Sequence, residues 1–187
     1  MKKCICLMVM FFSFGSVFSQ DIVEGYWKSF DKNTVSGYWI VYEENGLLFA
    51  TCLLATGLPV DATCKKCTRN YKGHPMMGKQ FPNLFRAQVP LVYNLRKVSP
   101  GVWENGHIID ARNGKVYTCE ISYKKADGKK FKEDCLAVRG EIAWGLGMTI
   151  YWKKASAAEI NAAIKDAAEN YGGDYARAHL DEFLIAE

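Results

Sequence analysis

The stretch that decides the fold reads VWENGHIIDARNGKVYTCEISY (102–123), DCLAVRGEI (134–142) and GLGMTIYW (145–152). Each piece is short and rich in apolar residues, and Gly, Asn and Asp residues lie within or between the pieces. Antiparallel strands joined by tight hairpins have this pattern, because the turns need residues that tolerate positive φ. The stretch therefore predicts a mainly β protein.

The same pattern continues toward the N-terminus and gives eight predicted strands. They span residues 24–30, 35–43, 47–56, 85–98, 102–110, 116–124, 135–142 and 148–153. Asn-Gly or Asp-Gly pairs mark three hairpin turns, whereas residues 57–82 form a long irregular segment. Eight sequential antiparallel strands leave two unpaired edges unless the sheet closes, so we predict an up-and-down barrel, with a β-sandwich as the alternative.

Residues 1–19 have the composition of a secretory signal peptide. Two lysines precede an apolar run over residues 5–12, and Val17 and Ser19 occupy the minus-three and minus-one positions of a cleavage site. The run is shorter than the roughly 20 apolar residues that cross a bilayer. We expect cleavage after Ser19, a periplasmic or secreted chain, and no transmembrane span in the mature protein. The alternative is an N-terminal membrane anchor.

The charges of the mature chain nearly balance. The whole chain has 24 basic and 20 acidic residues, and two of the basic residues lie in the expected signal peptide. The lysine clusters, such as Lys65-Lys66 and Lys129-Lys130, fall in predicted turns. This balance gives no electrostatic reason to expect nucleic acid as a partner.

Residues 155–187 change from a strand pattern to a helix pattern. Ser156 and Glu159 have the spacing of a capping box, which predicts that a helix begins there. Apolar residues then recur on one helical face at positions 160, 163, 164, 167 and 171. A Gly-Gly pair ends this helix, and a second helix is predicted to end near residue 184. We expect this helical extension to pack on the β domain of residues 20–154.

Five cysteines follow the signal peptide: Cys52, Cys64, Cys67, Cys119 and Cys135. Cys119 and Cys135 are equidistant in sequence from Asp127, so a hairpin centred there would place them opposite each other. This spacing predicts a cross-strand disulfide, which an oxidising compartment would permit. Cys52 lies on an apolar strand, which indicates a buried free thiol.

The Cys64-Lys65-Lys66-Cys67 motif has three interpretations. The favoured one is a disulfide that closes the loop. The second is a redox-active pair in which the lysines lower the pKa of a thiol, although the motif lacks the βαβ context of thioredoxin-like proteins. The third is half of a zinc site with His74 as a further ligand. We assign no metal and no cofactor.

Gly-x-Trp occurs three times, at residues 25–27, 37–39 and 101–103. The first copy opens the first strand, where lipocalin-like barrels carry the same triplet and the indole fills the closed end. We predict that five residues approach the interior or contribute to a ligand site: Trp27, Trp39, Tyr117, Arg139 and Trp152. Arg139 would form an ion pair with Asp110 or bind an anionic head group.

Further short patterns are spread along the β domain. They are Gly25-x-Trp27, Lys72-Gly73-x-Pro75-x-x-Gly78, the block from Trp103 to Tyr117, Val138-Arg139-Gly140 and Trp152. Together they resemble a family of small exported bacterial proteins, domain of unknown function 2147. The resemblance covers residues 24–153 and implies a compact exported β domain, possible calycin relatives, and no catalytic residue. Ala111, Met148 and Ile150 differ from the Pro, Arg and Gln that are usual in the family.

Two classes of function follow. The favoured one is a non-enzymatic binding protein that holds a small apolar or amphipathic ligand in the barrel. The alternative is a cell-envelope interaction module with a filled core, which would contact a protein partner through residues 57–82 or the helical tail. A thiol redox protein that uses Cys64 and Cys67 is a third option. The sequence offers no Ser, Cys or Thr with an evident neighbouring base, so we assign no catalytic residue.

Overall fold

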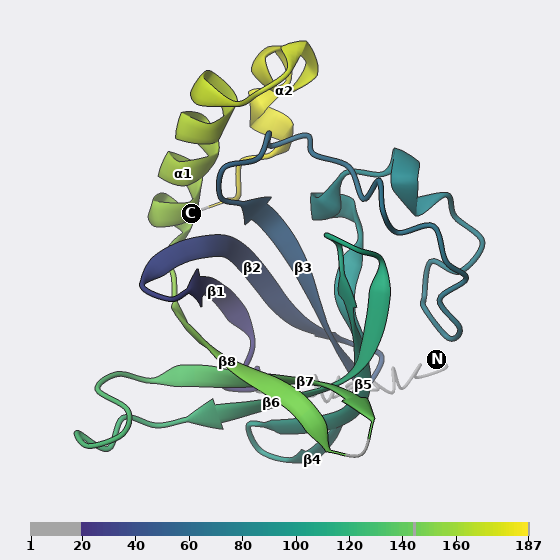
Figure 1. Ribbon diagram of the computed structural model, residues 1–187. Coiled ribbons are helices and arrows are strands. Elements are labelled where there is room, and N and C mark those ends of the chain that lie inside the picture. Colours follow the sequence, from purple (N-terminus) through teal and green to yellow (C-terminus); the bar gives the residue numbers. More distant parts are fainter. Residues whose placement is uncertain (1–19, 144, 187) are drawn as a thin grey trace, which may run out of the picture.

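The computed structural model describes residues 20–143 and 145–186, so the expected signal peptide lies outside the described residues. Its strands are β1 (Gly25–Asp31), β2 (Thr34–Glu44), β3 (Leu47–Ala55), β4 (Pro90–Ser99), β5 (Val102–Asp110), β6 (Lys115–Lys124), β7 (Cys135–Ala143) and β8 (Leu146–Lys154). Each strand pairs antiparallel with the next, and β8 pairs with β1, which closes a barrel (Figure 1). The predicted up-and-down barrel is confirmed, and the β-sandwich is excluded.

The seam between β1 and β8 is short. Trp27 faces Lys154 and Lys28 faces Lys153, and the ladder ends there. Immediately beyond it, the N–H of Ala155 donates to the carbonyl of Tyr26 at 3.1 Å. The first and last strands of the barrel are therefore joined near one end.

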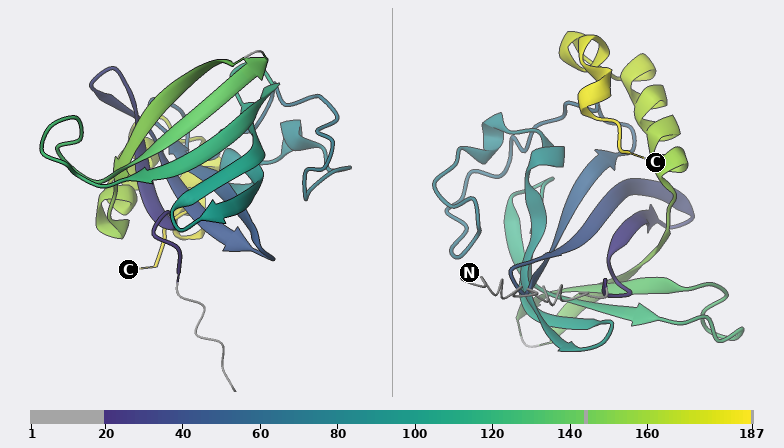
Figure 2. Two further views of the ribbon diagram at one scale, coloured as in Figure 1. Left: turned by 90° about the horizontal axis from the view of Figure 1, so that it is seen from below. Right: turned by 180° about the vertical axis from the view of Figure 1, so that it is seen from behind.

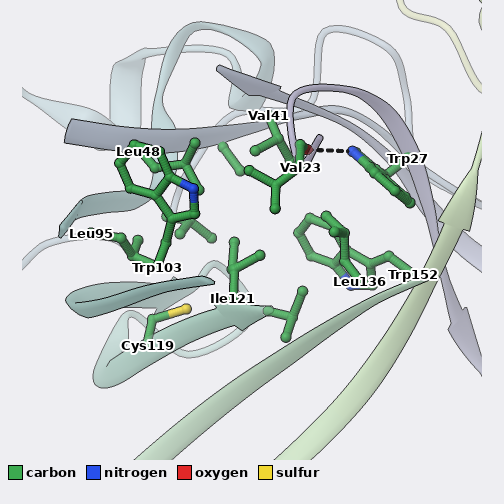
Figure 3. Close-up of a cluster of buried hydrophobic side chains, with 13 residues drawn as sticks. Val23, Trp27, Val41, Leu48, Leu95, Trp103, Cys119, Ile121, Leu136 and Trp152 are labelled. Carbon is green, nitrogen blue, oxygen red and sulfur yellow. Dashed lines mark hydrogen bonds between the residues drawn. The ribbon is translucent and has the colours of Figure 1, made fainter. Parts of the chain in front are cut away.

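The two ends of the barrel differ in packing. We name the end where β1 begins and β8 ends the closed end, and the opposite end the mouth. Because side chains alternate along a strand, every second residue faces the interior. Near the closed end, indoles and aliphatic side chains that are fully buried fill this interior (Figure 3): Trp27, Leu48, Leu95, Trp103, Ile121, Leu136 and Trp152.

The residues just before β1 pack into the closed end. Val23 is fully buried in the core, and its carbonyl accepts a hydrogen bond of 2.8 Å from Nε1 of Trp27 (Figure 3). The first Gly-x-Trp triplet therefore places its indole in the closed end, where the sequence pattern predicted it.

Asp21 fixes this N-terminal segment to the turn between β4 and β5. Its carboxylate accepts hydrogen bonds from the N–H groups of Val23 and Gly101 and pairs with Lys97 Nζ at 2.8 Å. Burial opposes ionisation, but the hydrogen bonds to Lys97 and the backbone outweigh it and lower the pKa of Asp21. The ionised form therefore stabilises the fold above the pKa of the unfolded chain, and this contribution is lost as pH falls through the folded-state pKa.

We expect Asp21→Asn to lower the free energy of unfolding at neutral pH by on the order of 1–2 kcal/mol, because hydrogen bonds to a charged group are lost. The difference from the wild type should shrink as the pH falls below 3.8, the ordinary pKa of an aspartate side chain. Urea unfolding at neutral pH and at about pH 3 measures both values. Asp181→Asn, at an exposed position, is the control. A loss that is equal at both pH values would contradict the role of the Asp21 carboxylate.

The segment between β3 and β4 covers the outer face of β3–β5. It contains two short 3₁₀ helices, η1 (Phe81–Asn83) and η2 (Arg86–Gln88), so the predicted strand over 85–98 begins only at Pro90. Buried side chains of the segment form a second apolar cluster with the outer residues of the barrel: Cys64, Cys67, Tyr71 and Phe81 with Phe49, Leu91, Tyr93 and Ile109. The segment is therefore packed on the barrel wall, and Trp39 also packs against this cluster.

The C-terminal helices cover another part of the barrel wall. Helix α1 (Ala157–Asn170) packs with Ile160 and Ile164 on Tyr38 and Leu54, which lie on the outer face of β2 and β3. Helix α2 (Asp174–Ala178) and the 3₁₀ helix η3 (Leu180–Glu182) replace the longer second helix that was predicted. The helical tail and the β3–β4 segment meet beside the barrel. The ring centroid of Phe85 lies 5.4 Å from that of Tyr175 and 5.7 Å from that of Phe183, and the right view of Figure 2 shows both parts in its upper half. None of the helices in the described part of the chain has the length and apolar character that a membrane crossing requires.

The first turn of α1 also binds β1. The Oγ of Ser156 accepts a hydrogen bond of 3.1 Å from the N–H of Glu159, which confirms the predicted cap. The Glu159 carboxylate instead binds Lys28 Nζ at 2.7 Å, so it does not complete a capping box. This ion pair joins α1 to β1 next to the short seam.

Candidate ligand-binding site at the barrel mouth

The inner face of the barrel changes toward the mouth. Four apolar or aromatic inner side chains are only half buried there: Trp39, Ile108, Tyr117 and Ile150. Trp39, Ile108 and Ile150 pack on the buried core. The fourth residue, Tyr117, is the register partner of Ile108 on the neighbouring strand. The filled closed end therefore gives way to a partly exposed apolar inner face.

Two stacked indoles form the boundary between these layers. The ring of Trp39 lies on that of Trp152, with centroids 4.6 Å apart and planes inclined by 22°. Nε1 of Trp39 donates to Ser29 Oγ at 3.1 Å, which fixes the orientation of the ring. Nε1 of Trp152 is buried and has no acceptor among the described residues. An unpaired buried donor costs about 1–3 kcal/mol, so this layer favours a polar acceptor nearby.

Gly140 leaves space on the inner face of β7. Its register partners are Cys119 and Met148. A Cβ at Gly140 would lie 3.6 Å from Ile108 Cγ2 and 3.9 Å from Tyr117 Cβ, which are ordinary contact distances. The backbone of β7 therefore faces the apolar side chains of β5 and β6 without a side chain of its own.

The rim of the mouth is apolar at the β7–β8 hairpin. Ile142, Leu146 and Met148 are 75%, 71% and 68% exposed. Such large apolar side chains are usually covered, and an exposed group of them marks a surface that contacts another molecule.

The five predicted site residues fall into three groups. Trp27 and Trp152 are fully buried and belong to the core. Trp39 and Tyr117 lie on the half-buried inner face near the mouth. Arg139 lies outside the barrel. Sequence reasoning missed Ile108 and Ile150. A count in steps of two from Trp152 reaches Ile150, whereas a count from Trp103 to Ile108 must allow for the register shift between Trp103 and Gly106.

The predictions for Arg139 are wrong. The inner residues of β7 are Leu136, Val138 and Gly140. Arg139 lies between the last two and therefore faces outward. Its guanidinium pairs with the carboxylate of Glu141 and donates to the carbonyl of Gly145 at 3.0 Å. Burial of Leu136 and Val138 gains more free energy than burial of the small residue Ala137 would. The face of the strand that carries Ala137 and Arg139 is therefore turned toward solvent.

The second partner predicted for Arg139 is also bound elsewhere. The carboxylate of Asp110 pairs with Arg112, which lies two residues later in the turn, at 2.9 Å. It also accepts a hydrogen bond from the Arg112 N–H. The predicted Asp110–Arg139 ion pair is therefore not formed.

The cysteines in the described part of the chain are buried free thiols. The predicted pairing of Cys119 with Cys135 is wrong, because the register of β6 and β7 places Cys119 opposite Gly140 and Cys135 opposite Lys124. The hairpin is not centred on Asp127. The Asp127 carboxylate accepts two backbone hydrogen bonds within a wider loop, and this shifts the register.

Cys64 and Cys67 lie in one turn of the β3–β4 segment. The N–H of Cys67 donates to the carbonyl of Cys64 at 2.7 Å, and the two residues are free thiols, so the loop-closing disulfide is not formed. His74 cannot serve as a further zinc ligand, because Nε2 lies 2.9 Å from the Pro90 carbonyl and Nδ1 accepts from the Met76 N–H at 3.0 Å. Among residues 20–143 and 145–186, no group of three metal-binding side chains is found.

Comparisons with known proteins bear on this geometry. A family model described as "uncharacterized protein conserved in bacteria" (DUF2147) matches residues 25–154. Among solved structures, protein HP1028 from Helicobacter pylori, described as a member of the lipocalin family, is similar with a TM-score of 0.56 and 18% identity. The similarity covers 75% of this chain and 87% of that chain. No curated protein matches the chain.

The two matches agree with the resemblance found in the sequence. The family model spans all eight strands, from the start of β1 to the end of β8. At 18% identity the structural similarity establishes the fold alone. The chain therefore belongs to the DUF2147 family of uncharacterized bacterial proteins, and its fold is a lipocalin-like barrel.

Proposed function

We propose that this protein is an exported, non-enzymatic binding protein that holds a small apolar or amphipathic ligand at the mouth of its barrel. The partial exposure of Trp39, Ile108, Tyr117 and Ile150 on the inner face carries this proposal. Apolar surface that stays in contact with water costs about 25 cal/mol per Å². A ligand that covers these side chains recovers that free energy.

The packing limits the size of such a ligand. The closed half of the interior is filled by the protein's own side chains, so the ligand occupies only the outer half. An eight-stranded barrel has room for one small ligand at most. The unpaired Nε1 of Trp152 next to this layer favours a ligand with a hydrogen-bond acceptor, and therefore an amphipathic one.

A second function is favoured by the β7–β8 hairpin. The exposure of Ile142, Leu146 and Met148 fits a cell-envelope interaction module that contacts a protein partner through this rim. The two functions differ in what they need from the inner face. A ligand-binding protein needs the space beside Gly140, whereas a module that acts through its rim does not.

We expect Gly140→Leu to raise the dissociation constant for an amphipathic probe, 1-anilinonaphthalene-8-sulfonate, by at least about tenfold, equivalent to about 1.4 kcal/mol. The leucine side chain would fill the space between Ile108 and Tyr117 that the ligand needs. Fluorescence titration measures the affinity, and thermal unfolding verifies that the variant folds.

Thr149→Leu is the matched control. Thr149 pairs with the outward Arg139, so the same side chain is added on the outer face of the neighbouring strand. This variant should bind the probe as the wild type does. Equal affinities of Gly140→Leu and wild type would exclude the mouth as the binding site, and absence of probe binding to the wild type would favour the interaction module.

A further inference from the structure

A pair of thiols lies in the β3–β4 segment, in the apolar cluster against which Trp39 also packs. Cys64 and Cys67 are 0% and 2% exposed, and both belong to the same buried cluster. The backbone hydrogen bond between the same two residues closes the turn that carries them. The first and last residues of such a turn have Cα atoms less than about 7 Å apart, so two thiols at these positions need little movement to form a disulfide.

The barrel holds this turn in place. The hydroxyl of Tyr71 donates to the carbonyl of Gly114 at 3.0 Å, which fixes the chain just after Cys67 to the β5–β6 turn. Gly114 also approaches the carbonyl of Lys66, within the motif, so closely that a Cβ would overlap with that oxygen. The two thiols are therefore positioned by the rigid part of the fold.

The two thiols have different environments. The interaction with the neighbouring Cys64 thiol outweighs burial and lowers the pKa of Cys67 to about 7. Arg86 favours the thiolate and Asp110 opposes it. The same interaction and burial raise the pKa of Cys64. At neutral pH the pair thus combines a thiolate with a neighbouring thiol, as a nucleophile and a resolving group require.

Cys67 lines a surface pocket. The pocket has a volume of about 390 Å³, and its walls come from residues 67–71 and 77–82. Cys64 is not among the lining residues, whereas the cationic side chains of Arg69 and Lys79 are. A small molecule in the pocket would therefore meet Cys67 first, in surroundings that suit a negative charge.

We propose that Cys64 and Cys67 form a redox-active couple that exchanges two electrons with a low-molecular-weight disulfide in this pocket. The Cys67 thiolate attacks one sulfur of the disulfide, which forms a mixed disulfide and releases the other half as a thiolate. Cys64 gives its proton to water and attacks the Cys67 sulfur, which forms the Cys64–Cys67 disulfide and releases the second half. The protein dithiol is oxidised, and the small disulfide is reduced to two thiols.

The test uses the anionic disulfide 5,5′-dithiobis(2-nitrobenzoate) on the native, reduced protein. In the wild type, the fast phase should release two nitrothiobenzoate ions and leave no adduct in the intact mass. Cys64→Ser should release one ion and retain the other half on Cys67. Cys67→Ser should slow the fast phase by at least about tenfold at neutral pH. Cys119→Ser, which removes another buried thiol, should behave as the wild type does.

A pair of Cys64 variants separates a positioning role from a structural one. In Cys64→Ser, a hydroxyl can still donate to the Cys67 sulfur, so the rate of adduct formation should keep a midpoint near pH 7. In Cys64→Ala the donor is lost, and the midpoint should move toward the ordinary thiol value. A wild type that retains the adduct, a Cys64→Ser variant that forms none, or equal midpoints in the two Cys64 variants would overturn the proposal. Circular dichroism verifies that each variant is folded.

Discussion

Trp27→Ala is expected to lower the free energy of unfolding by about 3–5 kcal/mol, a large share of the total for a domain of this size. The indole is fully buried in the closed end, and its removal leaves a cavity among Val23 and the other core side chains. The Val23 carbonyl also loses its hydrogen bond from Nε1. Lys154, whose Nζ lies 4.0 Å from the ring centroid, loses its aromatic neighbour. Urea unfolding followed by circular dichroism measures the loss.

Trp39→Ala is the matched comparison. Trp39 has the same side chain and pairs with Trp27 across β1 and β2, but it is only partly buried near the mouth. Its removal should cost clearly less, because water already reaches part of the ring. Equal losses for the two variants would contradict the division of the interior into a filled end and an open end.

Gly114→Ala is expected to cost about 2–4 kcal/mol and to release the β3–β4 segment from the barrel. Gly114 has φ of 68°, which is unfavourable for alanine by about 1–2 kcal/mol. The added Cβ would also overlap with the Lys66 carbonyl oxygen, and relieving such an overlap costs about 1–3 kcal/mol. Hydrogen exchange of residues 56–89 should accelerate relative to that of the strands.

Gly128→Ala separates the two causes. Gly128 has nearly the same φ, 70°, but nothing lies within 4 Å of a Cβ there. This variant should lose only the backbone contribution and leave the exchange of residues 56–89 unchanged. If both variants lost the same stability, the contact between the β5–β6 turn and the thiol-bearing turn would have no energetic weight.

Local chemistry explains why the strands could be predicted. Asn45 and Gly46 have φ of 53° and 78°, the conformation that an Asn-Gly hairpin turn needs, and this pair alone sets the end of β2 and the start of β3. The first Gly-x-Trp triplet likewise predicts, from three consecutive residues, that the Trp27 indole fills the closed end. Such features depend on neighbours in sequence, so the eight strands and the barrel followed from the pattern.

Features that depend on distant contacts could not be predicted in the same way. The register of β6 and β7 is set by a wide loop that Asp127 organises and by Tyr123, which binds Asp134. Whether Arg139 faces inward or outward depends on that register and on which residues of β7 gain most from burial in the interior. The β3–β4 segment has no periodic pattern, because its shape comes from packing on the outer face of the barrel.

The short seam between β1 and β8 has a consequence for the order of folding. The first strand, β1, pairs with residues 153 and 154 of the last strand. Its two further contacts, with Ala155 through Tyr26 and with Glu159 through Lys28, involve residues that follow later in the sequence. Contacts this far apart in sequence form slowly. A ribosome must therefore release nearly the whole chain before the barrel can close. This delay suits a protein whose N-terminus predicts export, since a chain that stays open during synthesis can still be threaded through a membrane.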